Sequence, residues 1–126
     1  MIEGLKDKVA IVTGGGHGIG KTYCLGFGRA GASVVTADID GPAAEAVASQ
    51  VAKETGAQSL GLSVDVSDER STKAMAAATI ERFGQIDILV NNAAIFATIP
   101  MNRGGIETID PKEWDRLIAA IARFDS

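Results

Sequence analysis

The chain has 126 residues, of which 46% are hydrophobic and 22% are charged. This length and composition are typical of one folded domain, and they exclude both a two-domain enzyme and a disordered tail. Twelve basic and sixteen acidic residues give a net charge of -4, so no cationic field exists to hold nucleic acid or an anionic membrane surface. We therefore predict one soluble domain over residues 1–126, with no nucleic-acid or membrane partner.

The cysteine content and the hydropathy pattern indicate the compartment. Cys24 is the one cysteine, so we expect no internal disulfide, and no second cysteine stands near it to bind a metal. The sequence shows neither a signal peptide nor an apolar run long enough to cross a bilayer. We expect a cytoplasmic protein without a metal site, in which Cys24 is a packing residue.

The first predicted elements are a strand and a helix. The run at residues 8–13 is apolar and rich in β-branched side chains, which predicts a strand buried on both faces. A cluster of glycines follows. Ile19, Tyr23 and Phe27 then recur at every fourth residue and predict the apolar face of a helix, with Gly31 as its stop.

The same order of strand and helix occurs again in the next segment. A second β-run at residues 33–37 leads to Asp38. Asp40 suits a helix start, and the alanine-rich segment continues that helix until Gly56. This segment therefore predicts a second strand and a second helix.

A third strand and helix and a fourth strand follow. The weaker strand at residues 59–64 ends at Asp65, and Ser67 with the acids after it favours a helix start. Gly84 is the predicted stop of that helix. The apolar run at residues 86–90 predicts the fourth strand, which leads into a pair of asparagines.

One more helix is predicted near the end of the chain. Asp110 and Pro111 suit its first turn. Its apolar stripe consists of Trp114, Leu117, Ile118 and Ile121. Short connections between alternating strands and helices imply parallel strands with right-handed crossovers. The predicted fold class is α/β, a Rossmann-type doubly wound parallel sheet that is truncated after about four strands and a final helix.

The glycine turn between the first strand and the first helix is the main candidate site. Residues 13–20 read TGGGHGIG, and a helix N-terminus at this place offers free N–H groups and a positive dipole end to a phosphate. Gly14 allows the sharp turn, Gly18 the approach of a ligand, and Gly20 the close packing of the helix. An ordinary glycine-rich turn is the alternative. His17 either donates a hydrogen bond to a phosphate or points to solvent.

Two acidic residues at strand ends extend this candidate site. Asp38 is placed to accept both ribose hydroxyls of an adenosine and to repel a 2′-phosphate, which favours NAD over NADP. No lysine or arginine lies in the glycine turn, and Ile39 follows Asp38. Asp65 suits the adenine amino group, with Val66 beside it for apolar and backbone contact. The alternatives are that Asp38 merely ends a strand and that Asp65 is a loop residue.

In these features the chain resembles the classical subgroup of the short-chain dehydrogenase/reductase family. The match consists, in chain order, of Thr13-Gly14-x-x-x-Gly18-Ile19-Gly20, Asp38, Asp65-Val66 and Asn91-Asn92-Ala93-Ala94. Ala94 stands where the family usually has glycine. The resemblance implies that Asn92 and Ala93 lie against the adenosine ribose, for which plain loop capping is the alternative. The resulting cofactor-binding set is Gly14, His17, Gly18, Ile19, Gly20, Asp38, Asp65, Val66, Asn92 and Ala93.

The resemblance also implies hydride transfer between a nicotinamide and an alcohol or carbonyl carbon, carried by a serine, a tyrosine, a lysine and an asparagine. Tyr23 is the only tyrosine, and Phe27 rather than lysine stands four places after it. Ile121 stands where the asparagine is expected. We therefore predict no catalytic residue, and the hypothesis is an amino-terminal part of a dehydrogenase, incomplete at the C-terminus, that binds NAD weakly and has no turnover.

Other functions fit parts of the pattern. A non-catalytic nucleotide-binding or regulatory module is the main alternative, and it would form homo-oligomers through the exposed last helix and the edge strand. An adenosyl-methionine transferase shares the glycine turn but does not account for Asn91 and Asn92. The extended sugar-nucleotide branch of the same superfamily spaces its glycines differently.

Overall fold

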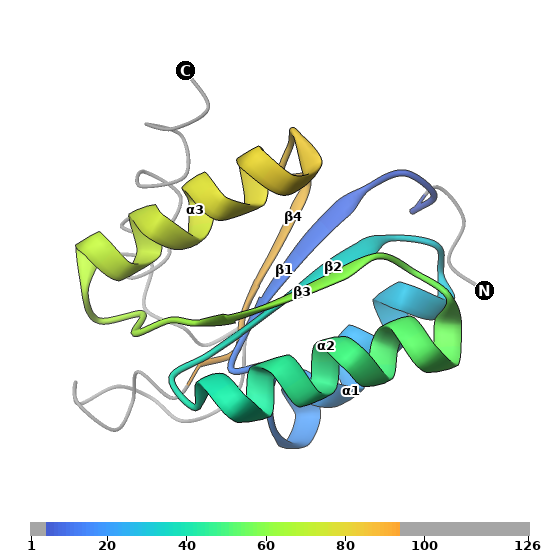
Figure 1. The fold of residues 1–126 in the computed structure, drawn as a ribbon, viewed down its shortest axis with the longest axis horizontal. Coiled ribbons are helices and arrows are strands. Elements are labelled where there is room, and N and C mark those ends of the chain that lie inside the picture. The colour runs from blue at the N-terminus through green and yellow to red at the C-terminus, as the bar shows by residue number, and fades with distance from the viewer. Residues whose placement is uncertain (1–4, 94–126) are drawn as a thin grey trace.

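The computed structural model describes residues 5–93, and the predicted last helix lies outside them. Strands and helices alternate along the described chain, as predicted (Figure 1). The strands are β1 (Val9–Thr13), β2 (Ser33–Asp38), β3 (Ser59–Ser63) and β4 (Ile88–Asn91). The helices are α1 (Gly18–Arg29), α2 (Gly41–Thr55) and α3 (Glu69–Phe83).

The four described strands form one parallel sheet in the order β3-β2-β1-β4. Ile11 of the central strand β1 pairs with Val35 of β2 on one side and with Leu89 of β4 on the other. Helices α1 and α2 cover one face of the sheet, and α3 covers the other (Figure 1). The predicted α/β class and the doubly wound parallel sheet are confirmed.

The core has two clusters, one on each face of the sheet. Successive side chains of a strand point to opposite faces, so Ile11 and Val12 contribute to different clusters. The cluster on the α3 side contains Ile11, Val35, Ala37, Val64 and Met75. The cluster on the side of α1 and α2 contains Val12, Cys24, Val34, Val47 and Val51. Both faces of β1 and β2 are therefore buried, as the apolar run of β1 predicted for that strand.

The helix ends follow local rules. Asp40 caps α2 by accepting a hydrogen bond from the Ala43 N–H at 3.1 Å. Asp68 caps α3 by accepting one from the Arg70 N–H at 2.9 Å. Both helices end at a glycine with positive φ, Gly56 or Gly84, a conformation that other residues rarely adopt.

The predicted apolar face of α1 is correct only in part, because Tyr23 and Phe27 are half-buried and pack against the core cluster that contains Cys24. Ile19 is 60% exposed, whereas Gly20, Cys24 and Gly28 form the buried side of the helix. The physical reason is the close approach of α1 to its neighbours, which leaves room for small residues only. A Cβ on Gly28 would lie 2.8 Å from Val51 Cγ1 and 2.8 Å from Thr55 Oγ1 of α2.

Side chains hold the pairing of β1 with β4 at both of its ends. At the start, Asp87 Oδ2 accepts a hydrogen bond from the Val9 N–H at 2.8 Å. At the end, the Thr13 hydroxyl donates to Asn91 Oδ1 at 3.0 Å. β4 begins at Ile88, two residues later than predicted, and Asp87 contacts β1 from just before it.

Two glycines of α1 provide a matched test of this close packing. Gly28→Ala should lower the free energy of unfolding by about 1–3 kcal/mol, because its methyl group overlaps two β-branched side chains of α2. Gly26→Ala should raise the free energy of unfolding by about 0.5–1 kcal/mol, because the added methyl group meets no atom within 4 Å and alanine favours the helix. Urea denaturation measures both changes. Equal effects of the two substitutions would contradict this packing.

Candidate functional site

The carboxyl ends of β1, β2 and β4 meet at one edge of the sheet, and the candidate site lies there. The glycine turn connects β1 to α1 at this edge, and Gly14 and Gly18 both have positive φ, +65 and +53. Asp38 is the last residue of β2, and Asn91 is the last of β4. Because the strands are parallel, residues far apart in sequence come together at this edge.

The glycine turn is packed closely on several sides. A Cβ on Gly14 would lie 2.9 Å from the carbonyl oxygen of Asn92, and one on Gly16 would lie 3.0 Å from Asp38 Oδ2. A Cβ on Gly20 would overlap the Gly14 carbonyl oxygen, so α1 can start this close to the turn only with glycine there. The turn therefore needs its glycines for packing as well as for conformation.

Gly18 differs from these glycines. No atom lies within 4 Å of the position that its Cβ would take, so this residue borders open space at the first turn of α1. The side chain of His17, the N-cap residue, makes no capping hydrogen bond, and no acidic residue lies in the first turn. The N-terminal N–H groups of α1 are thus not capped by a side chain, unlike those of α2 and α3.

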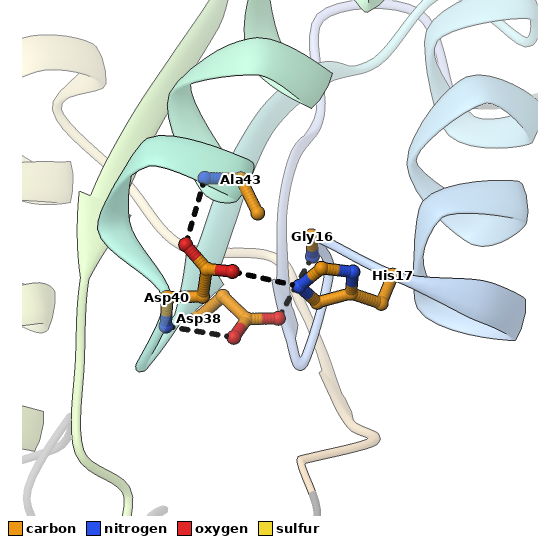
Figure 2. A network of polar contacts seen from close by, with 5 residues as sticks. All are labelled: Gly16, His17, Asp38, Asp40 and Ala43. Atoms are coloured by element: carbon orange, nitrogen blue, oxygen red, sulfur yellow. Dashed lines mark hydrogen bonds and ion pairs between the residues drawn. The ribbon is translucent and has the colours of Figure 1, made fainter.

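The Asp38 carboxylate connects two loops of the site. Its side chain is buried, Oδ2 accepts a hydrogen bond from the Gly16 N–H at 3.0 Å, and Oδ1 accepts one from the Asp40 N–H at 3.0 Å (Figure 2). The main-chain carbonyl oxygen of Asp38 accepts a separate hydrogen bond from the Val64 N–H at 2.9 Å. This carboxylate is therefore held in one orientation directly beside the glycine turn.

His17 lies next to Asp40 rather than alone in solvent. Its Nε2 is 3.0 Å from Asp40 Oδ2, and both side chains are exposed (Figure 2). The hydrogen bond from the Ala43 N–H, and then the one from His17, lower the pKa of Asp40. This contact joins the turn after β1 to the turn after β2, on the solvent side of Asp38.

The Thr13 hydroxyl organises the end of β4. It donates to Asn91 Oδ1, and it accepts hydrogen bonds from the N–H groups of Asn92 at 3.0 Å and Ala93 at 3.2 Å. Asn92 Nδ2 in turn lies 3.5 Å from the Gly14 carbonyl oxygen. The asparagine segment is thus attached to the glycine turn. Among residues 5–93, the buried Asn91 Nδ2 has no acceptor.

Asp65 and Val66 occupy the loop between β3 and α3. Asp65 Oδ1 accepts hydrogen bonds from the N–H and the hydroxyl of Ser67, at 3.0 and 2.6 Å, and these bonds lower the pKa of Asp65. Val66 packs partly against the core cluster that contains Met75. In the described chain no hydrogen bond joins this pair to the glycine turn or to Asp38, so their predicted contact with adenine stays a prediction.

Cys24 lies behind the glycine turn. Its Sγ contacts the Gly15 carbonyl oxygen at 4.0 Å and accepts a hydrogen bond from the Thr36 hydroxyl at 3.4 Å. The side chain is fully buried, and this burial raises the pKa of the thiol to about 11. The position fits the predicted packing role.

Sequence reasoning missed three features of the site. Thr13 is a polar residue at the end of a buried strand, a pattern that signals a structural hydroxyl. Asp40 was expected only to start a helix, yet it also contacts His17. Ile39, which is 72% exposed beside Asp38, was considered only as the residue that follows it. A large apolar side chain at a turn position was the available signal for Ile39.

No group of three or more histidine, cysteine, aspartate or glutamate side chains in residues 5–93 is arranged to hold a metal ion. None of the described helices is both long enough and apolar enough to span a bilayer.

The chain is similar in sequence to known dehydrogenases. A family model described as short chain dehydrogenase matches residues 8–121. The short chain dehydrogenase/reductase astE of Aspergillus oryzae is 40% identical over 114 residues, which are 90% of this chain and 42% of that protein. The 7alpha-hydroxysteroid dehydrogenase of Escherichia coli is 43% identical over 89 residues, which are 71% of this chain and 34% of that protein. This chain spans less than half the length of either relative.

Solved structures share the fold. A 7alpha-hydroxysteroid dehydrogenase in complex with NADH and 7-oxo glycochenodeoxycholic acid matches with a TM-score of 0.76 and 31% identity, over 94% of this chain and 48% of that one. A hydroxysteroid dehydrogenase from Escherichia coli matches with a TM-score of 0.74, also at 31% identity, over 94% of this chain and 52% of that one.

The Thr13 hydroxyl can be tested by an isosteric change. Thr13→Val should lower the free energy of unfolding by about 1–3 kcal/mol, because the N–H groups of Asn92 and Ala93 lose their acceptor. Thr13→Ser keeps the hydroxyl and should cost less. Urea denaturation compares the two variants, and a serine variant as unstable as the valine variant would show that the methyl group is what matters.

The buried thiol predicts a pH dependence. The raised pKa of Cys24 means that the folded state disfavours the thiolate. The contribution of the buried thiol to the free energy of unfolding is therefore complete below pH 9.0, the ordinary pKa, and is lost as the pH rises to about 11. The difference between the two pKa values corresponds to about 2–3 kcal/mol in the free energy of unfolding. Cys24→Ala should lack this decline when unfolding is measured by urea at several pH values. A parallel decline in both proteins would contradict the burial of the thiol.

Proposed function

The chain belongs to the short-chain dehydrogenase family, and on this premise we propose that it is the NAD-binding part of an oxidoreductase that acts on an alcohol or carbonyl compound. The structures of family relatives include one with NADH and a steroid. The residues of this chain itself support the proposal.

The open position at Gly18 carries the proposal. A diphosphate needs backbone N–H groups that are not capped, together with space for its oxygens, and the first turn of α1 has both. Positive φ at Gly14 and Gly18 directs the backbone around this space. The residues present therefore fit the diphosphate of a dinucleotide.

Asp38 supplies the proposed contact with the adenosine ribose. Each carboxylate oxygen accepts one backbone hydrogen bond and retains acceptor capacity for a ribose hydroxyl. A 2′-phosphate in the same place would meet this negative charge, and residues 14–17 contain no lysine or arginine. These features support NAD over NADP.

The adenine and the strand ends complete the proposed cofactor site. The exposed Ile39 offers an apolar surface to a base next to Asp38, and the loop of Asp65 and Val66 offers a carboxylate for its amino group. Asn92 and Ala93 border the glycine turn through their contacts with Thr13 and Gly14. We assign all of these residues to the adenosine side.

NAD, when bound, supplies a nicotinamide ring that accepts or donates a hydride. The residues of this chain bind and orient the cofactor. Tyr23 cannot act as the acid of the family, because it lies in α1 and packs partly against the cluster of Val12 and Cys24. The proposed role of this chain is therefore cofactor binding without turnover, which also fits a non-catalytic nucleotide-binding module.

The proposal extends to the compartment and the assembly of the protein. The single buried cysteine is compatible with a reducing cytoplasm. Homo-oligomerisation through the stripe at residues 114–121 stays a prediction, since these residues lie outside the described part of the chain.

Two open glycines with positive φ provide a matched test. Gly18→Ala and Gly56→Ala should each lower the free energy of unfolding by about 1–2 kcal/mol, because both residues adopt the left-handed conformation. At both positions the added Cβ would meet no atom within 4 Å. Only Gly18→Ala should weaken NAD binding, by about tenfold or more, because its methyl group enters the space for the diphosphate. Titration with NAD, followed by two-dimensional amide NMR, measures both variants.

The same spectra of the unsubstituted chain locate the ligand. Amides of the glycine turn and of the end of β2 should shift with NAD at millimolar concentrations. The proposed function is wrong if these amides do not respond, or if the two alanine variants bind NAD equally well. Circular dichroism establishes that both variants are folded before titration.

A further inference from the structure

The contact between His17 and Asp40 joins the two loops that flank Asp38. Asp40 caps α2 with Oδ1, whereas its Oδ2 lies 3.0 Å from His17 Nε2 (Figure 2). The Ala43 N–H fixes the carboxylate, so His17 meets an acceptor that is already oriented. The pair lies directly beside Asp38, which is bonded to the backbone of both neighbouring loops, at Gly16 and at Asp40 itself.

His17 is the only side chain in these two loops that can become a cation. The glycine turn at residues 14–17 and the loop at residues 38–43 contain no lysine or arginine. When protonated, the imidazole would be the natural partner of an extra phosphate placed beside Asp38. In this structure its Nε2 faces a carboxylate instead.

We propose that Asp40 is a second specificity-determining residue, which holds the His17 imidazole away from a 2′-phosphate and so reinforces the selection of NAD over NADP. The inference depends on the proposed function, because it concerns the ribose side of the same site. Asp38 repels the extra phosphate directly. Asp40 adds a second negative charge and engages the one side chain of these two loops that can become a cation.

The other charged groups on these elements lie farther along the helices. Lys21 follows His17 by one turn of α1, and Glu45 stands beyond the first turn of α2. Arg29 and Glu54 pair with each other at 3.5 Å near the far ends of the two helices.

The variant Asp40→Asn tests the inference. Its amide oxygen still accepts the hydrogen bond from the Ala43 N–H, so α2 keeps its cap, but the negative charge next to His17 is lost. Binding of NADP should strengthen about tenfold near pH 6 and about threefold near pH 8, because only the protonated imidazole attracts the phosphate. Binding of NAD should change by less than about twofold. Amide NMR titrations with each dinucleotide supply the dissociation constants.

Two further variants serve as controls, one for the loss of a negative charge and one for the role of His17. Glu54→Gln removes the same charge from the far end of α2 and should leave the ratio of NADP to NAD affinity unchanged. In the double variant His17→Gln with Asp40→Asn, the additional gain near pH 6 should disappear.

The remaining outcomes contradict either the inference about Asp40 or the proposed function. An affinity ratio that Asp40→Asn leaves unchanged at both pH values overturns the inference. So does a gain that persists in full without His17, since Asp40 would then act by its charge alone. Failure of the unsubstituted chain to bind NAD overturns the proposed function itself, and is read from the titration before any variant is compared.

Discussion

The candidate site depends on one buried carboxylate and the two backbone N–H groups that bind it. Burying a carboxylate is costly unless hydrogen bonds replace its water, and Asp38 receives one from Gly16 and one from Asp40. The first comes from the loop after β1 and the second from the loop after β2. The same group that would bind a ribose thus fixes the relative position of the two loops.

This double role has a consequence for ligand binding. The carboxylate needs no reorientation when a ligand arrives, because the protein already holds both oxygens in place. Preorganised groups of this kind lower the entropy that binding costs. The same holds for the asparagine segment, where the Thr13 hydroxyl sets the positions of Asn92 and Ala93 before any ligand is present.

Local signals predicted much of this fold. The cap at Asp40 and the stops at Gly56 and Gly84 were predicted because such residues act on their own backbone. The parallel direction of the strands was predicted because short connections between alternating strands and helices imply crossovers. The fully buried side of α1 was not predicted, because it depends on the distance between α1 and the neighbouring elements. A pattern of Ile19, Tyr23 and Phe27 contains no information about that distance.

The contacts of the site were predictable only in part for a related reason. The glycine turn and Asp38 stand at strand ends, and the parallel topology brings such ends together. The contact of His17 with Asp40 joins residues 23 positions apart, and it requires the actual path of two loops. The hydroxyl of Thr13 likewise contacts residues 78 to 80 positions away.

The two polar attachments of β4 determine how its backbone is aligned with that of β1. β4 has four residues, too few for its apolar pattern to define one alignment firmly. A shift by a single residue would separate Asp87 from Val9 and Asn91 from Thr13 together, and would turn every side chain of β4 to the wrong layer. The short strand is therefore expected to join the sheet in one alignment or not at all.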